Sequence, residues 1–224
     1  MMQDCEKAIV EIHLSRLFAR CPALSGLSPD FFRAVEVLVA SLRNGGTLYL
    51  CGNGGSAADA EHIVGELMKG FLQSRRLPQA ERNVYFSLLD KDEKSDLLVN
   101  GLQLGLRAVS LVGHPALTTA LSNDNDAALI FAQPLSVWAR PGDVLLAIST
   151  SGNADNVELA ARVARVKRAS VIGLTGASGG RLKKWSDVWL GVPETSTFLV
   201  QELHQPLYHA LSATLEEIFF VQPD

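Results

Sequence analysis

Residues 47–62 read TLYLCGNGGSAADAEH: an apolar run, a glycine-rich loop and then a stretch with helical spacing. Strand, loop and helix in this order form a common anion-binding unit. Glycines let the backbone approach a ligand closely, and the free N–H groups of the first helical turn attract negative charge. We expect Ser56 to cap the helix, with Asp59 at the third helical position. The stretch therefore predicts a phosphate site at the end of a β-strand.

One alternative is that the bound phosphate is part of a nucleotide. Gly52, Gly54 and Ala57 satisfy the G-x-G-x-x-A pattern of dinucleotide-binding folds. That pattern also expects an acidic residue about 20 positions further on, at the end of a second strand. Here the corresponding stretch, residues 73–83, reads QSRRLPQAERN and contains no strand. We therefore expect no nucleotide cofactor.

The rest of the chain repeats the alternation of apolar runs and helical patterns. Helical patterns at 125–139, 153–167 and near 179–185 separate several apolar runs. These runs are continuously apolar, which is typical of strands covered on both faces. The order predicts an α/β fold with a parallel sheet. The five strands are expected at 47–52, 108–113, 143–149, 170–176 and 187–192.

Helices are expected at both ends of the chain. Residues 5–19 and 29–43 have helical apolar faces, and the sequence NGG at 44–46 ends the second helix. Residues 199–220 predict a long last helix. Pro206 lies inside it, so we expect either a kink or a later start.

Residues 71–101 do not follow the alternation of apolar runs and helical patterns, because they are polar and charged around a short apolar VYFSLL. We interpret them as an insertion, either a lid or a flap that reaches a neighbouring subunit. A surface excursion without a role is the alternative. No repeat or linker interrupts the chain, so residues 1–224 are expected to form one domain, with N-terminal helices in 1–44.

Composition narrows the class of protein. A chain of 224 residues, 47% hydrophobic and 20% charged, suits one domain with a full core. A net charge of −4 lacks the basic excess of nucleic-acid binders, and the pairs Arg75-Arg76 and Lys183-Lys184 are expected to be solvated surface charge. Three scattered cysteines suit a reducing cytoplasm. No apolar run approaches the roughly 18 residues that a membrane span needs.

A second loop has the same character as the first. ISTSGN at 148–153 leaves an apolar strand and enters a helix, which places the hydroxyl groups of Ser149, Thr150 and Ser151 beside free N–H groups. A simple turn with a helix cap would explain one of these hydroxyls but not three. No Walker lysine accompanies either loop. Together the two loops suggest a small phosphorylated ligand held from several sides.

Polar side chains on two predicted helices form a third group. His62 and Glu66 are four residues apart and share a helix face, and Gln201, Gln205 and His209 follow one another in the same steps. Two such faces could form a metal site or an acid–base pair, and HIVGE is not the HExxH of zinc proteases. Ordinary solvated or core residues are the alternative. His13 and His114 are assigned to that alternative.

Taken together, these motifs resemble the SIS (sugar isomerase) family, and specifically its phosphoheptose isomerases. CGNGGSAADAEHIVGEL (51–67) resembles their first phosphate loop and active-site helix, and PGDVLLAISTSGNADNV (141–157) resembles their second loop. VPETSTFLVQELHQPLYHALSATLEE (192–217) resembles their closing strand, loop and helix. The resemblance implies a flavodoxin-like five-stranded parallel sheet between helices. It also implies a homotetramer with sites at the subunit interfaces.

The resemblance further implies a reaction and the residues that perform it. The reaction is aldose–ketose isomerisation through an enediol, from sedoheptulose 7-phosphate to D-glycero-D-manno-heptose 7-phosphate. Glu66 and His209 match the acid–base pair, with Glu66 assigned as the base. The zinc ligands of some members match His62, Glu66, Gln201 and His209. The sugar-phosphate pocket is expected to contain Asn53, Gly54, Ser56, Asp124, Ser149, Thr150, Ser151 and Gln201.

The sequence departs from the family pattern in places that keep two alternatives open. Ala154 stands where a further serine is usual, and Phe198 where an acidic residue is frequent. An isomerase or binder of another sugar phosphate is therefore one alternative. A non-catalytic regulator that keeps the fold and tetramer, as the replication-initiation regulator does, is the other. The complete set of matched ligands favours an enzyme.

Overall fold

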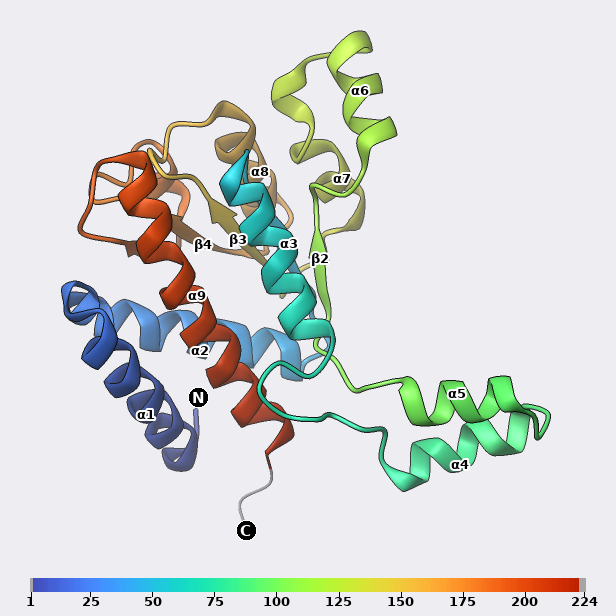
Figure 1. The fold of residues 1–224 in the computed structure, drawn as a ribbon. Coiled ribbons are helices and arrows are strands. Elements are labelled where there is room, and N and C mark those ends of the chain that lie inside the picture. Colours follow the sequence, from blue (N-terminus) through green and yellow to red (C-terminus); the bar gives the residue numbers. More distant parts are fainter. Residues whose placement is uncertain (1, 222–224) are drawn as a thin grey trace.

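A computed structural model describes residues 2–221 of the chain, and its centre is one parallel sheet (Figure 1). The strand order is β2-β1-β3-β4-β5, the order of flavodoxin-like folds. All five predicted strands are present, each slightly shorter than expected. They are β1 (Leu48–Cys51), β2 (Ala108–Ser110), β3 (Val144–Ile148), β4 (Ser170–Thr175) and β5 (Val188–Gly191).

Helices cover both faces of the sheet, which explains why the strands are continuously apolar. Leu48 and Leu50 of β1 belong to one buried cluster, and Tyr49 and Cys51 belong to another on the opposite face. The first face is covered by α1 (Asp4–Arg20), α2 (Ser28–Arg43), α3 (Gly55–Met68) and α9 (Thr197–Phe220). The second is covered by α7 (Ala132–Trp138) and α8 (Asp155–Val166).

Two of the helix predictions need correction. The helix expected at 125–139 is wrong: α6 (Pro115–Asp124) ends first, and α7 begins at Ala132. The Asp126 side chain accepts a hydrogen bond from the Ala128 amide at 2.8 Å, and this bond caps a separate short turn between the two helices. The later start considered for the last helix is also wrong, because α9 begins at Thr197 and continues past Pro206. Across residues 2–221, no helix is long and apolar enough to cross a membrane.

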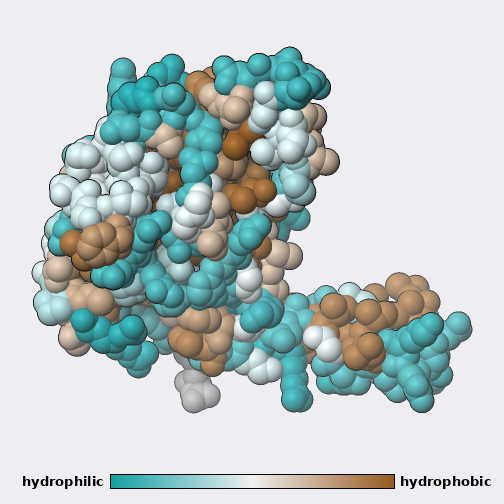
Figure 2. All heavy atoms as spheres, turned by 45° about the horizontal axis from the view of Figure 1, so that its top comes forward, coloured by the Kyte–Doolittle hydropathy of each residue, from teal (hydrophilic) through white to brown (hydrophobic). Residues whose placement is uncertain are grey.

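The segment interpreted as an insertion contains a helical hairpin, which the sequence reasoning did not predict. It consists of α4 (Gln79–Leu88) and α5 (Glu93–Gly101), and it projects from the body of the molecule (Figure 1). Its apolar side chains remain largely uncovered: Leu88 is 78% exposed and Leu97 is 72% exposed. Figure 2 shows hydrophobic surface, in brown, along the projecting arm.

An arginine expected on the surface holds the base of this segment. The Arg75 side chain is completely buried, and its Nε lies 2.8 Å from Glu216 Oε1. The same guanidinium donates to the carbonyl oxygen of Leu67 at 2.7 Å. The Glu216 carboxylate also accepts the amide N–H groups of Phe71 and Leu72. Arg75 is therefore structural, because it ties the end of α3 to α9.

Glu216 is charged in this arrangement despite its burial. Burial acts to raise the pKa of Glu216, but the amides of Phe71 and Leu72 and the Arg75 guanidinium outweigh it, so the pKa lies below its ordinary value. Each partner thus needs the other, since an unpaired buried charge is costly.

Replacing Arg75 should destabilise the fold much more than replacing its neighbour. We expect Arg75→Leu to lower the free energy of unfolding by about 3–5 kcal/mol, because Glu216 would be left as an uncompensated buried charge. Arg76 is exposed, so Arg76→Leu should change stability by less than about 0.5 kcal/mol. Urea unfolding of both variants measures the difference, and equal midpoints would contradict the structural role of Arg75.

Candidate functional site

The two glycine- and hydroxyl-containing loops open at the same edge of the sheet. Parallel pairing sets Cys51, the last residue of β1, opposite Ala147 of β3, so both loops leave the sheet side by side. Between them lies a cavity of about 350 Å³. Its lining includes Asn53, Gly54, Ser56, Ser149, Thr150, Ser151 and Gln201. All of the predicted phosphate-loop residues therefore meet in one place.

The first loop differs in one detail from expectation. Helix α3 begins at Gly55 with Gly54 as its N-cap, and no side chain caps it, so the predicted Ser56 cap is wrong. Ser56 instead lies buried within the first turn. Gly54 has φ +55, a left-handed conformation that suits glycine. At Gly55 a Cβ atom would lie 2.2 Å from Gln201 Nε2. The uncapped helix start is thus available to an anion.

An asparagine pair that the sequence reasoning missed joins the two loops. The Asn53 amide donates to Asn156 Oδ1, and the Asn156 amide donates back to Asn53 Oδ1, both at 2.8 Å. Asn53 belongs to the first loop and Asn156 to the first turn of α8. The only sequence signal was the second asparagine of SGNADN. The pair fixes the distance across which a phosphate would be held.

Packing of α3 against α9 brings His62, Glu66 and His209 together. The Nε2 atoms of His62 and His209 lie 3.1 and 3.2 Å from Oε1 of Glu66. The two imidazole rings are 5.2 Å apart between centroids, in an edge-to-face arrangement. Ligand atoms from all three residues lie within 4.8 Å of one another. The geometry thus places three of the four residues matched to zinc ligands in one cluster.

The cluster carries unsatisfied lone pairs. Glu66 is only 5% exposed, and within residues 2–221 neither of its carboxylate oxygens, nor Nε2 of His209, has a hydrogen bond of acceptable geometry. Burial raises the pKa of Glu66, while burial and then the charge of His62 lower the pKa of His209. The ordinary values of the two groups, about 4.3 and 6.5, are thus moved toward each other. Atoms that converge without pairing are suited to share a proton or a cation.

Two residues that sequence reasoning missed orient His62. The Tyr208 hydroxyl donates to Asp59 Oδ1 at 3.1 Å, and its oxygen lies 3.2 Å from Nδ1 of His62. Because the tyrosine proton is directed to Asp59, the hydroxyl oxygen favours the tautomer of neutral His62 that carries its proton on Nδ1. That arrangement leaves a lone pair on Nε2, the nitrogen that faces Glu66. The signal was the position of Asp59, one helical turn before His62.

The remaining predicted residues lie at different distances from the cluster. Gln201 is two turns before His209 on α9, about 12 Å along the helix axis. It lines both the phosphate cavity and a second cavity of about 490 Å³ that contains His62 and Tyr208. Asp124 is exposed at the end of α6 and lines neither cavity within one chain. Gln201 thus lies between the phosphate loops and His62, whereas Asp124 lines neither of the two cavities.

Removing the tyrosine hydroxyl should release the orientation of His62. We expect Tyr208→Phe to lower the population of the Nδ1-protonated imidazole, because its acceptor is lost. Nitrogen-15 NMR of labelled histidine measures the two tautomers directly. Tyr85→Phe, on the projecting α4, serves as the matched control and should leave the His62 signals unchanged. Identical His62 spectra for wild type and Tyr208→Phe would refute the role of Tyr208.

Comparison with known proteins adds to this geometry. The sequence pattern of the SIS domain matches residues 24–85 and 98–176, and it leaves out 86–97 in the projecting hairpin. A phosphoheptose isomerase from Rhodospirillum rubrum is 37% identical over 194 residues, 87% of this chain and 88% of that protein. The structure of a phosphoheptose isomerase from Neisseria gonorrhoeae is similar, with TM-score 0.70 and 30% identity over 94% of this chain and 98% of that one. Another, from Francisella tularensis, has TM-score 0.69 and 27% identity over 96% and 100%.

Proposed function

Since this chain belongs to the SIS domain family, among the phosphoheptose isomerases, we propose that it interconverts sedoheptulose 7-phosphate and D-glycero-D-manno-heptose 7-phosphate. The observation that carries the proposal is the continuity of the site. Two phosphate-binding loops lie at one end, and Gln201 leads from them to the cluster of His62, Glu66 and His209. A phosphate anchored in the loops leaves the carbonyl end of the sugar within reach of the cluster.

Binding and chemistry are divided between the two ends. The first turn of α3 and the hydroxyls of Ser149, Thr150 and Ser151 hold the phosphate, which is remote from the bonds that change. This anchoring positions the reacting carbons against the acid–base groups. The asparagine pair Asn53–Asn156 keeps the two loops at a fixed separation.

In the isomerisation itself, Glu66 removes a proton and His209 manages the oxygen protons. From the ketose, the Glu66 carboxylate takes a proton from C1, and the electron pair forms the C1–C2 double bond of the enediol. Return of the proton to C2 gives the aldose, while His209 transfers the hydroxyl proton from O1 to O2. The raised pKa of Glu66 makes it a stronger base than an exposed carboxylate, and the lowered pKa of His209 eases its release of a proton.

We further propose that the cluster holds zinc. The unsatisfied oxygens of Glu66 and the lone pair on His62 Nε2 fit the nitrogen and oxygen ligands that zinc prefers. His62, Glu66 and His209 would hold the ion, and the resemblance adds Gln201. When bound, zinc would polarise the substrate carbonyl and stabilise the enediolate. Glu66 cannot be a tight ligand and a free base at once, so the two roles require a change at this carboxylate.

The proposal also includes the oligomeric state of the enzyme and its location in the cell. A homotetramer with sites at subunit interfaces is supported by Asp124, which the family resemblance places near substrate but which is remote from both cavities within one chain. A cytoplasmic enzyme is supported by Cys5, Cys21 and Cys51, all of which are free thiols.

Another sugar phosphate remains the second candidate substrate, and two lining residues favour testing it. Ala154 lies at the phosphate cavity, where the family usually offers a serine hydroxyl. Phe198, 61% exposed, lines the cavity that contains His62. A panel of C5 to C7 sugar phosphates, followed by NMR, identifies the preferred chain length. The non-catalytic alternative would need neither Glu66 nor His209 in the observed cluster.

Removing either acid–base group should abolish most of the activity. We expect Glu66→Gln and His209→Gln to lower kcat on sedoheptulose 7-phosphate by about 10²–10⁴-fold, the usual contribution of such a group. Glu61→Gln is the matched control, because Glu61 lies exposed on the same helix. Near-full rates for both cluster variants beside an active wild type would show that other residues catalyse the reaction.

Zinc should stabilise the folded chain independently of turnover. We expect zinc added to chelator-treated protein to raise Tm, since binding at about 100 times Kd contributes about 2.7 kcal/mol. His62→Ala should remove most of this shift, and His114→Ala, outside the cluster, should keep it. Differential scanning calorimetry measures both. A zinc-induced shift that survives His62→Ala would place the ion elsewhere.

A further inference from the structure

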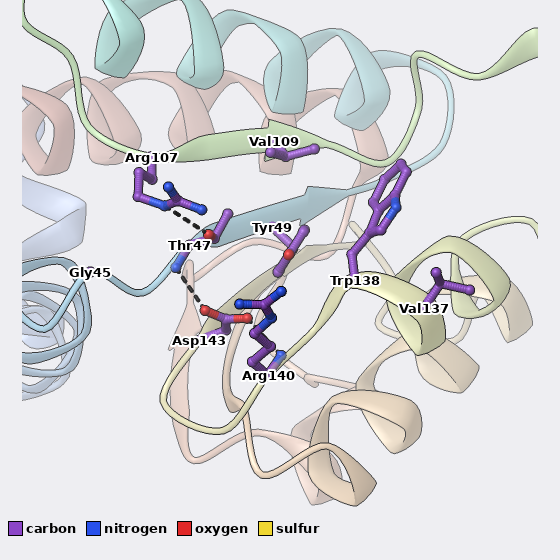
Figure 3. Close-up of a pocket in the computed structure, with 9 residues that line it drawn as sticks. All are labelled: Gly45, Thr47, Tyr49, Arg107, Val109, Val137, Trp138, Arg140 and Asp143. Atoms are coloured by element: carbon purple, nitrogen blue, oxygen red, sulfur yellow. Dashed lines mark hydrogen bonds between the residues drawn. The ribbon is translucent and has the colours of Figure 1, made fainter.

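A cavity of about 460 Å³ lies at the amino ends of the strands, the edge of the sheet opposite to the sugar-phosphate site (Figure 3). Thr47 precedes β1, Arg107 precedes β2, and Arg140 and Asp143 precede β3. The cavity is therefore built by the three loops that enter adjacent strands. None of its lining residues belongs to the phosphate loops or to the cluster on α3 and α9.

Positive charge predominates in this cavity. The Arg107 and Arg140 side chains both extend into it (Figure 3). Within residues 2–221 neither guanidinium forms an ion pair, in contrast to Arg75 or Arg162. The one acidic group, Asp143, accepts the amides of Thr47 at 2.8 Å and of Arg140 at 2.7 Å, so both of its oxygens already have donors. Two guanidinium groups beside one occupied carboxylate leave a net positive site.

The rest of the lining is aromatic and apolar. Tyr49 contributes a ring from the middle of β1, beside Val109 of β2, its partner in the sheet. Trp138, at the end of α7, is 37% exposed, and its indole packs edge-to-face on His114 with 5.1 Å between ring centroids. This contact holds the indole in place at the cavity while much of it remains uncovered. A flat ligand group would find an aromatic surface beside the charges.

We propose that this cavity is a second ligand site, which takes a small organic anion with a planar ring, as a nucleoside monophosphate is. The phosphate would bind Arg107 and Arg140 through charge-assisted hydrogen bonds, and the ring would lie against Trp138. The volume is within the range of about 300–1,000 Å³ typical of small-molecule sites. The sugar phosphate of the proposed reaction carries no ring of this kind in its open-chain form, so the two sites differ in ligand class.

Adenosine 5′-monophosphate is the probe, and isothermal titration calorimetry of the whole chain is the measurement. Wild type should bind it saturably. Arg140→Ala should weaken binding about tenfold or more, because the phosphate loses a charge-assisted hydrogen bond. Trp138→Leu should also weaken binding, because the ring loses the aromatic surface against which it lies. Arg140→Ala keeps the backbone amide that binds Asp143, so the loop is preserved. Arg76→Ala is the surface control and should bind as wild type does.

Further arms separate this site from the first and identify the ligand class. Ser151→Ala, in the sugar-phosphate cavity, should leave binding of the nucleotide unchanged. Saturating sedoheptulose 7-phosphate should not displace it. Loss of binding in Ser151→Ala, or displacement by the sugar phosphate, would assign the nucleotide to the first site and overturn the proposal. So would the absence of saturable binding, or equal affinity for adenosine or for inorganic phosphate alone.

Discussion

Strand β1 pairs with β3 in parallel, with Leu48 opposite Val144 and Cys51 opposite Ala147. Because β1 ends within one residue of the end of β3, the glycine loop after β1 and the hydroxyl loop after β3 leave the sheet together. Helix α3 then starts at Gly55 from a fixed point, and its next turns carry His62 and Glu66 to a fixed depth against α9. A register shift by one residue would move one loop past the other and turn the buried side chains of the strand to the wrong face. Anchoring and chemistry therefore depend on one strand pair.

Besides the pairing of β1 with β3, the site depends on the burial of Glu66. A carboxylate removed from water is costly unless partners compensate it, and the neighbours of Glu66 are two imidazoles at 3.1 and 3.2 Å rather than a permanent cation. Glu216, on α9, has the opposite surroundings, a buried arginine and two backbone amides. The two sets of neighbours move the pKa values of these glutamates in opposite directions, up for Glu66 and down for Glu216. The raised pKa supports the proposed role of Glu66 as a base, whereas Glu216 is held ionised.

The sequence predicts those features of the structure that depend on neighbouring residues, and it misses those that depend on contacts between distant residues. The five strands follow from continuous apolar runs, and the grouping of His62 with Glu66 follows from helical spacing alone. Arg75 was misjudged because its partner Glu216 is 141 residues away, and a charged pair in sequence carries no mark of burial. The sequence gives no reason to single out Tyr208, because a tyrosine beside His209 looks like an ordinary core residue. Its role in orienting His62 arises only where α3 packs against α9. The helix expected at 125–139 is interrupted because the Asp126 side chain accepts the Ala128 amide and caps a separate turn. A single side-chain hydrogen bond of this kind is not visible in the apolar pattern.

The projecting hairpin lies in the connection that leads from α3 to β2, an edge strand of the sheet. β2 pairs with β1 alone, so chain added between α3 and β2 does not have to cross a neighbouring strand or its covering helices. The SIS pattern resumes within α5 and continues through β2, the outer neighbour of β1. This fold can therefore lengthen at that connection while its loops keep their spacing. The same position is where a lineage can acquire a new contact surface by insertion, while the pairing of β1 with β3 stays unchanged.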